Sequence, residues 1–381
     1  MTAFNKVVIT ISNWNKKGRF AKIFNIADGI TRQFYNDELQ NCEIIEQITN
    51  NNQALNINEA NLVILPANNV GVMFQRTLPF SIYRNDTLYG KFFINTSTSN
   101  TNKTLYQVKV SDYMNVLESQ TYLGGLYNNE TVSNIVADIL GDIPYTISAG
   151  IGALTISGYL PIMNKRDALR EVAFCTNALV STARNDEIKI IGLPTTSSRT
   201  IGKDEIVSIE TTQPNITTEI DLETTKLTTK NASTDNIFNE TLNGTTSIIF
   251  DSPKFDLAIT GGTIVSSNIN YAIITGTGST VTLTGKSYEE TTVTTSKTNA
   301  YVVTTDIAKV ETYETTLTCN NSLLDNLNFI QYKIKSRFVM GSTKVGDIVT
   351  LNGQKARVTS LDYDISQTNI YCDAELEAYY E

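Results

Sequence analysis

The sequence predicts an α+β protein dominated by β-structure and divided into several domains. At 381 residues the chain is too long for one ordinary hydrophobic core. Short segments with alternating apolar residues, which are typical of strands, lie on both sides of a stretch with helical apolar spacing. Threonine, serine and asparagine replace much of the lysine and glutamate that is usual on protein surfaces, and this composition favours strands and turns.

The first part of the chain, residues 1–111, is predicted to form an antiparallel barrel or sandwich. The spacing of its apolar segments fits short strands joined by turns. The turn at Asn85-Asp86 between two of these segments predicts a hairpin. The predicted strands are 7–11, 20–26, 30–35, 42–48, 62–65, 81–84, 88–94 and 105–110.

Residues 112–197 are predicted to form a central α/β module. Its first helix is expected to have Asn129 as its N-cap, Glu130 in the first turn and Gly141 at its end. The predicted buried face of this helix contains Val132, Ile135, Val136, Ile139 and Leu140.

Glycines mark the turns of this module. Gly124, Gly125 and Gly141 are the structural turn candidates. If Gly124 or Gly125 has a positive φ angle, we expect it to tolerate substitution poorly, because a Cβ would clash there.

The second half of the module continues with strands at 145–147 and 154–156, a helix from Asn164, and a strand at 187–193. Asp167 is placed for a cap-box-like return to the helix start. The predicted buried stripe contains Leu169, Val172, Ala173, Thr176 and Val180.

Two further β regions complete the chain. Residues 198–300 are predicted to form a Thr/Ser/Asn-rich β domain, because apolar residues still alternate within the polar sequence. Its hydroxyl-rich faces are interpreted either as a contact surface for another component or as a product of AT-rich coding bias. Residues 301–381 are predicted to form a β-meander with a helical turn at 321–327 and a long strand at 329–338.

Catalytic and metal chemistry is disfavoured by the residue content. The sequence has no histidine, which excludes Ser-His-Asp and Cys-His centres and His-ligated metals. The acidic pairs Asp37-Glu38 and Glu289-Glu290 are interpreted as surface charge and not as a glycosidase pair. No phosphate-binding glycine loop is found, so neither an enzyme activity nor a cofactor is predicted. The four cysteines, which lack CxxC spacing, are expected to be reduced and mostly buried: Cys42, Cys175, Cys319 and Cys372.

Charge and hydropathy limit the partners. The net charge of −9 disfavours a nucleic-acid-binding surface. No apolar run approaches the length of a membrane helix, so membrane insertion is not expected. The N-terminal residues show no secretory signal, and we therefore expect a soluble cytosolic chain that leaves the cell by another route, such as lysis.

The motifs of the central module resemble the central domain of tail hub proteins from phages of low-GC Gram-positive bacteria. These proteins belong to the baseplate-hub family, which is shared with contractile bacteriocins and related injection particles. The resemblance covers the stretch 122–193. It rests on the segments 122–127, 130–140, 145–147, 158–162 and 166–169 in that order.

The resemblance implies a trimeric structural protein. Two barrel domains, at 1–111 and 301–381, would each be similar to the tail-tube subunit, so three chains would supply six barrels and adapt a six-fold tube to a three-fold spike. Implied partners are the tail-tube protein, a spike or tail lysin, and other baseplate proteins. DNA would pass the channel without specific binding, and the acidic net charge would repel its phosphates. The implied location is the baseplate of a particle assembled in the bacterial cytoplasm.

Two alternatives remain within tail proteins. A receptor- or carbohydrate-binding protein would use tyrosine- and hydroxyl-rich β surfaces, although such a binder is expected to end in a fibre-like or lectin-like domain. A tail-tip or distal-tail protein of a non-contractile phage is the other alternative, and the sequence does not separate contractile from non-contractile particles.

Overall fold

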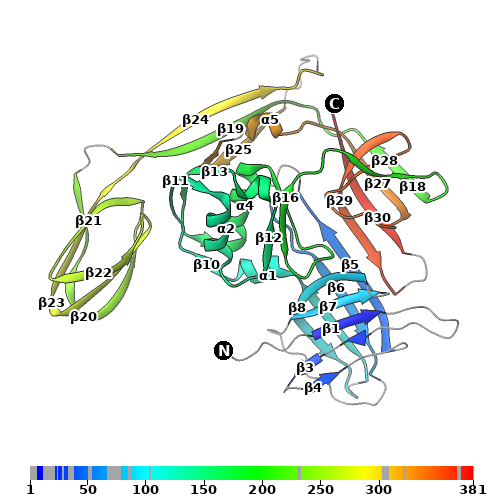
Figure 1. The fold of residues 1–381 in the computed structure, drawn as a ribbon, viewed down its shortest axis with the longest axis horizontal. Coiled ribbons are helices and arrows are strands. Elements are labelled where there is room, and N and C mark those ends of the chain that lie inside the picture. The colour runs from blue at the N-terminus through cyan, green and yellow to red at the C-terminus, as the bar shows by residue number, and fades with distance from the viewer. Residues whose placement is uncertain are drawn as a thin grey trace.

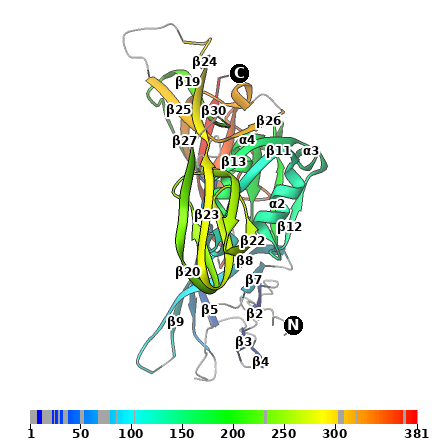
Figure 2. The same cartoon turned by 90° about the vertical axis from the view of Figure 1, so that its left-hand side faces the viewer.

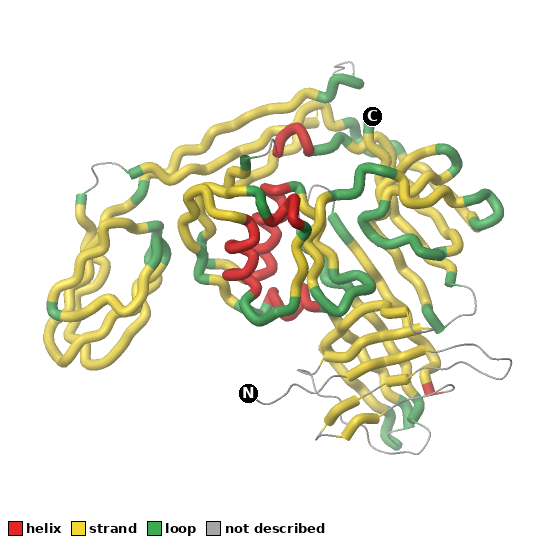
Figure 3. The backbone as a smooth tube through the Cα atoms, in the orientation of Figure 1, coloured by secondary structure: helices red, strands yellow, loops and turns green. Residues whose placement is uncertain are grey.

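The structure, a computed structural model, is dominated by strands (Figures 1 and 3). The helices within residues 113–176 gather in one central module, and a short helix at 323–326 lies beside it. It describes residues 7–11, 22–23, 25–27, 30–32, 38–49, 54–66, 79–84, 87–102, 104–229, 233–302, 309–320, 323–366 and 370–380. No helix in these ranges is long and apolar enough to span a membrane.

One large sheet joins the two ends of the chain (Figure 1). Its main path runs β18 (Ile206–Thr212), β27 (Ile330–Val339), β30 (Tyr371–Tyr379), β29 (Gln354–Asp364), β5 (Leu39–Gln47), β6 (Glu59–Ile64), β9 (Tyr106–Ser111), β8 (Thr87–Ser99), β7 (Pro79–Arg84), β1 (Val7–Ile11) and β2 (Lys22–Ile23). Two more strands, β28 (Ile348–Leu351) and β17 (Ser197–Ile201), extend from β29. A separate hairpin pairs β3 (Asn25–Ala27) with β4 (Ile30–Arg32).

The join between the two terminal regions is the antiparallel pair β5–β29. Its register runs from Glu43 opposite Asp364 to Gln47 opposite Ser360. The alternation predicted for both regions is confirmed by the buried-exposed pattern of the strands, as in β30. The described strands form an open path, so the closure of each region into a barrel stays a prediction.

The two terminal regions also share one hydrophobic core. Cys42 and Ile44 of β5 belong to the same buried cluster as Phe338 of β27 and Leu361 of β29. Each fully buried large apolar side chain contributes roughly 1.5–3 kcal/mol to folding. The sheet therefore has one buried face and one face without this apolar cover.

The central module packs its helices against three small sheets. Its elements are α1 (Tyr113–Glu118), β10 (Thr121–Tyr122), β11 (Gly125–Thr131), α2 (Val132–Leu140), β12 (Tyr145–Ile147), α3 (Ala149–Gly152), β13 (Thr155–Leu160), β14 (Met163–Asn164), α4 (Lys165–Thr176), β15 (Ala178–Ser181) and β16 (Ile188–Gly192). The predicted buried residues of α2 are all buried in a second core cluster.

The predicted start of α2 is wrong by two residues. Thr131, not Asn129, is the N-cap, and its side chain accepts a hydrogen bond from the backbone N–H of Asn134. Asn129 instead lies in β11 with a φ angle of 55°. The reason is tertiary, because pairing with β13 extends the strand as far as Thr131 and overrides the local capping preference of Asn129.

The predicted start of α4 is confirmed. Asn164 is the N-cap, and its Oδ1 accepts a hydrogen bond of 2.8 Å from the backbone N–H of Asp167. The Nδ2 of Asn164 also donates to the carboxylate of Asp167 at 2.7 Å. The helix ends at Thr176 because Asn177 adopts a left-handed conformation, so Val180 lies on β15 and not on the helix.

A long ribbon passes over the central module and leads to a distal sheet beside it (Figure 1). Figure 2 faces this sheet. The ribbon consists of β19 (Thr217–Thr228), β24 (Glu289–Thr298) and β25 (Lys309–Thr315). The distal sheet consists of β20 (Thr234–Ile249), β21 (Lys254–Thr260), β22 (Gly262–Ser267) and β23 (Tyr271–Ser287), which enclose a core of their own. After the ribbon, β26 (Leu317–Cys319) pairs with β13 and is followed by α5 (Leu323–Asn326).

Candidate functional site

The uncovered face of the large sheet carries a polar groove of about 670 Å³. We call it the sheet groove. Its lining comes from both terminal regions of the chain and from β18, so it exists only because β5 pairs with β29. The lining includes Ile45, Gln47, Ser208, Glu210, Lys335, Arg337, Ser360, Asp362, Asp373 and Glu375.

A ladder of ion pairs joins β27 to β30, and two of its three pairs line one side of the sheet groove. Basic residues at alternate positions of β27 lie directly opposite acidic residues at alternate positions of β30. The pairs are Lys333–Glu377 at 3.9 Å, Lys335–Glu375 at 3.2 Å and Arg337–Asp373 at 3.3 Å. Since the side chains of the pairs Lys335–Glu375 and Arg337–Asp373 are largely exposed, each of these two pairs contributes no more than about 1 kcal/mol and is weakened by salt. In the longer Lys333–Glu377 pair only the lysine is exposed.

The middle of the sheet groove is acidic. Asp362 of β29 lies directly opposite Asp373 of β30. Partial burial, together with the charges of Glu43 and Asp373, raises the pKa of Asp362. The three carboxylates therefore form a negative strip at the seam between the two terminal regions.

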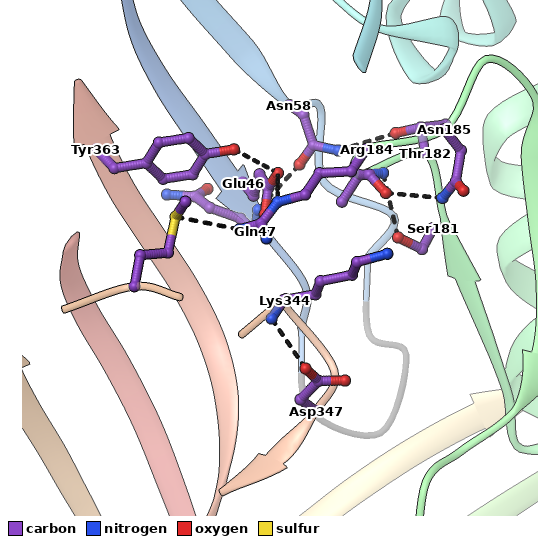
Figure 4. Close-up of polar contacts among 12 residues, drawn as sticks. Glu46, Gln47, Asn58, Ser181, Thr182, Arg184, Asn185, Lys344, Asp347 and Tyr363 are labelled. Carbon is purple, nitrogen blue, oxygen red and sulfur yellow. Dashed lines mark hydrogen bonds and ion pairs between the residues drawn. The ribbon is translucent and has the colours of Figure 1, made fainter. Parts of the chain in front are cut away.

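Arg184 fixes the central module to this seam from the buried side (Figure 4). Its Nε lies 3.3 Å from the Glu46 carboxylate of β5, which also accepts a 2.6 Å hydrogen bond from the Tyr363 hydroxyl of β29. The guanidinium lies over the Tyr89 and Tyr363 rings, at 5.7 Å and 5.4 Å from their centroids. Glu46, Arg184 and Tyr363 are here called the junction cluster.

The junction cluster is buried. The side chains of Arg184 and Glu46 are only 6% and 1% exposed. Burial lowers the pKa of the Arg184 guanidinium, but the nearby Glu46 carboxylate more than reverses this effect and raises it. Burial and the nearby Glu46 charge raise the pKa of Tyr363. The arrangement is suited to holding three segments together, and it presents no group to a substrate.

A second buried polar group lies next to this junction. Asp112, which follows β9 and caps α1, accepts hydrogen bonds from the backbone N–H of Asn58 at 3.1 Å and of Met114 at 2.9 Å, and from the Thr182 hydroxyl. The Asn58 amide also donates to Thr182 at 2.8 Å. Complete burial raises the pKa of Asp112 to about 6. Asp112 thus connects the start of α1 and the turn after β15 to the loop before β6.

The turn at Gly124 is where the distal sheet contacts the central module. The Asn268 amide donates to Gly124 O at 2.8 Å, and the buried Asn270 amide donates to Leu123 O at 3.0 Å and to Leu160 O at 2.9 Å. Gly124 has a φ angle of +67°, and a Cβ there would lie 2.1 Å from Leu160 O.

The other two candidate glycines have different environments. A Cβ on Gly125 would have its nearest contact at 3.8 Å, and its φ lies outside the left-handed region. Gly141 is the C-cap of α2 with a φ of +59°, and its Cβ would meet only the Lys165 ammonium at 3.9 Å. The sequence predicted that a glycine with a positive φ angle here would tolerate substitution poorly. Gly124 has such a φ angle, and Gly125 does not.

Of the acidic pairs named from sequence, Asp37-Glu38 cannot be placed as a pair, because Asp37 lies outside the described residues. The pair Glu289-Glu290 lies on the ribbon, apart from the sheet groove and the junction cluster. Glu290, on the ribbon, accepts a hydrogen bond of 3.3 Å from the Tyr159 hydroxyl. In the part of the chain that is described, no three acidic or cysteine side chains are grouped to hold a metal ion. The four cysteines form no disulfide: Cys42, Cys175 and Cys372 are buried, and Cys319 is half-buried.

Sequence reasoning did not identify the junction cluster. One signal was available, because Glu46 continues the alternation of the buried residues Cys42 and Ile44 and so occupies a core position. A carboxylate at such a position needs a cationic or hydrogen-bonding partner. No local pattern around Arg184 indicates that it supplies this partner.

Comparison with solved structures identifies proteins that share the fold of this chain. No protein-family profile and no curated protein sequence matches the chain. Its structure is similar to prophage tail protein gp18 from Listeria monocytogenes, with a TM-score of 0.51, 9% identity, and coverage of 92% of this chain and 91% of that chain.

Two further tail proteins give the same result. The tail protein from Neisseria meningitidis has a TM-score of 0.53 and 8% identity, and the match covers 93% of this chain and 96% of that chain. The 43 kDa tail protein of prophage MuSo2 from Shewanella oneidensis has a TM-score of 0.52 and 8% identity, with coverage of 92% and 96%. Over almost its whole length, the chain therefore has the fold of these phage-type tail proteins.

Proposed function

We propose that the chain is a structural hub protein of a phage tail or phage-like particle, and that it acts as a homotrimeric ring between a six-fold tube and a three-fold spike. The observation that carries the proposal is the continuous sheet built from both ends of the chain. Each chain contributes two adjoining sheet regions, so three chains around an axis would present six. The shared fold with prophage tail proteins supports a place in such a particle.

In this ring, the polar face of the large sheet faces the channel. The negative strip at Glu43, Asp362 and Asp373 then lies where DNA passes. Carboxylates repel phosphates, whereas a basic wall would bind DNA with strongly salt-dependent affinity. The chain itself carries out no reaction; its partners are the tube protein above and a spike or tail lysin below, together with other baseplate proteins.

The mass of the assembled protein tests this proposal. Light scattering on a sizing column should give three times the 42.1 kDa chain mass for the protein alone, and three copies of the chain per complex when tube and spike proteins are co-expressed. Electron microscopy should then show rings with three-fold symmetry. The hub proposal would be overturned if the protein stays monomeric in the presence of both partners, at concentrations well above those at which tail particles assemble.

Receptor binding by the distal sheet is the second candidate function. The observation that favours it is a row of threonines across three strands, with Thr245 and Thr263 exposed and Thr275 half-buried between them, on an element that projects from the molecule. Thr234 pairs with Lys286 at the base of this sheet, so a short linker can replace the segment between them. Particles with this deletion should assemble but fail to adsorb to cells if the sheet binds a receptor. Unchanged adsorption would exclude that role.

A further inference from the structure

Two of the four cysteines, far apart in sequence, meet in the folded chain. Cys175 lies in the last turn of α4, and Cys319 is the last residue of β26. Helix α4 packs against β26, and the two thiols hydrogen-bond to each other. Cys175 belongs to the core cluster of the central module, and Cys319 packs against this cluster. Cys42 and Cys372 lie in the separate core of the large sheet.

The two cysteines lie where the chain returns from the ribbon to the central module. Strand β26 follows the ribbon strand β25 and pairs with β13 of the module, with Cys319 opposite Ile156. The contact between Cys175 and Cys319 is therefore one of the places where the chain that returns from the ribbon is attached to the module. Cys319 is half-buried and can be reached by a small molecule, whereas Cys175 is fully buried.

We propose that Cys175 and Cys319 are a redox-active pair that forms an intramolecular disulfide when the protein meets an oxidising small-molecule disulfide such as glutathione disulfide. The Cys319 thiolate attacks one sulfur of the oxidant, and the first glutathione leaves as a thiol. The Cys175 thiolate then attacks the Cys319 sulfur of the mixed disulfide and releases the second glutathione. Two protein thiols are oxidised to one disulfide, and one glutathione disulfide is reduced to two thiols.

The environment of Cys175 determines how the second step depends on pH. Its hydrogen bond with Cys319, followed by burial, raises the pKa of the Cys175 thiol. Because the thiolate is the attacking species, disulfide closure is slow at neutral pH and accelerates as the pH rises. The pair stays reduced in a cytosol and closes in an oxidising medium. The cross-link then fastens β26 to α4 and restricts the unfolded chain.

The test is a thiol map of the full-length protein. The purified chain is incubated with glutathione disulfide, alkylated in denaturant and digested with trypsin. Cleavage after Arg170, Arg184, Lys309 and Lys333 places Cys175 in peptide 171–184 and Cys319 in peptide 310–333. We expect two of the four thiols to be lost, and the two peptides to appear as one linked species that a reductant separates.

Matched variants separate this pair from the other cysteines. The linked species should vanish in Cys175→Ala, which should instead retain glutathione on Cys319. It should persist in the double variant Cys42→Ala/Cys372→Ala. Four free thiols in the oxidised wild type, a stable glutathione adduct on its Cys319, or a link to Cys42 or Cys372 would each overturn the proposal. If the double variant does not fold, the wild-type peptide map still decides.

Discussion

Arg184 is the residue at which the three main parts of the molecule meet. It comes from the central module, and its partners Glu46 and Tyr363 come from the N-terminal and C-terminal halves of the large sheet. A charge in such a buried place is tolerated only when it is paired. The junction cluster thus links the relative positions of the three parts to a few side-chain contacts.

Replacing Arg184 with methionine should destabilise the protein strongly. The change leaves the Glu46 carboxylate buried without its cation, which costs about 3–5 kcal/mol. The matched control is Arg337→Met in the exposed ion-pair ladder, for which we expect less than about 1 kcal/mol. Urea unfolding followed by circular dichroism measures both. A loss for Arg184→Met that is as small as the loss for the control would show that the junction cluster does not stabilise the fold.

Gly124 and Gly125 should respond differently to the same substitution. Gly124→Ala places a Cβ 2.1 Å from Leu160 O and forces alanine into a left-handed conformation, so we expect a loss of about 2 kcal/mol or more. Gly125→Ala has open space and should change the free energy of unfolding by less than about 1 kcal/mol. Urea unfolding compares them. A neutral Gly124→Ala variant would contradict the described turn.

Asp112 should make stability fall as the pH rises. Its pKa is about 6 in the folded chain, against 3.8 for the unperturbed group, so folding favours the protonated form. This contribution is fully present below about pH 4 and is lost as the pH rises through 6. It amounts to about 3 kcal/mol in total. Between pH 4 and pH 8, the free energy of unfolding of the wild type should fall relative to that of Asp112→Asn, as measured from unfolding curves. Parallel pH profiles would refute the assignment.

Among the elements, the distal sheet is the most independent. It has its own core and reaches the rest of the chain through the ribbon. Its orientation is fixed by the amides of Asn268 and Asn270 on the carbonyls around Gly124, and by Tyr159 on Glu290. Such a sheet can hold its structure while its attachment is weakened.

The double variant Asn268→Ala/Asn270→Ala should therefore release the distal sheet without unfolding it. Three backbone carbonyls lose amide donors, and the sheet then moves about the ribbon. Small-angle X-ray scattering should show a larger radius of gyration, while circular dichroism stays unchanged. Asn239→Ala, on the same sheet but away from the module, is the control. An identical scattering profile for the double variant and the wild type would show that these amides do not fix the orientation.

At the scale of the whole molecule, the shared sheet makes the two ends of the chain depend on each other. Strand β5 takes β29 as its neighbour, and the apolar cluster beneath them includes residues from both ends. A fragment containing only one end would expose an unpaired strand edge and part of the core. Cooperation between the termini is thus a property of the complete chain.

Residues 1–111 expressed alone should fail to fold cooperatively. Without β29, the edge of β5 and the side chains Cys42 and Ile44 are uncovered. We expect aggregation or a broad thermal transition, and partial rescue when residues 198–381 are co-expressed. Sizing chromatography and thermal unfolding provide the readout. A soluble, cooperatively folding fragment 1–111 would show that the predicted N-terminal domain is independent of the join.

The sequence by itself determined the features that depend on near neighbours. Alternation identified the strands of the terminal regions, and helical spacing with Asn164 and Asp167 identified α4 and its first turn. Absence of histidine excluded whole classes of chemistry. These signals can be read from the sequence because the strand period, the helix period and the cap at the start of α4 each depend on residues only a few positions apart.

Only the tertiary structure decided which distant segments meet. The pairing of β5 with β29, the contact of Arg184 with Glu46 and the approach of Cys175 to Cys319 leave no local pattern. Even the start of α2 was moved by a partner strand. Alternation shows that a strand has a buried face but does not name its neighbour, because many strands satisfy the same hydrophobic requirement. That choice is made by the packing of the complete chain.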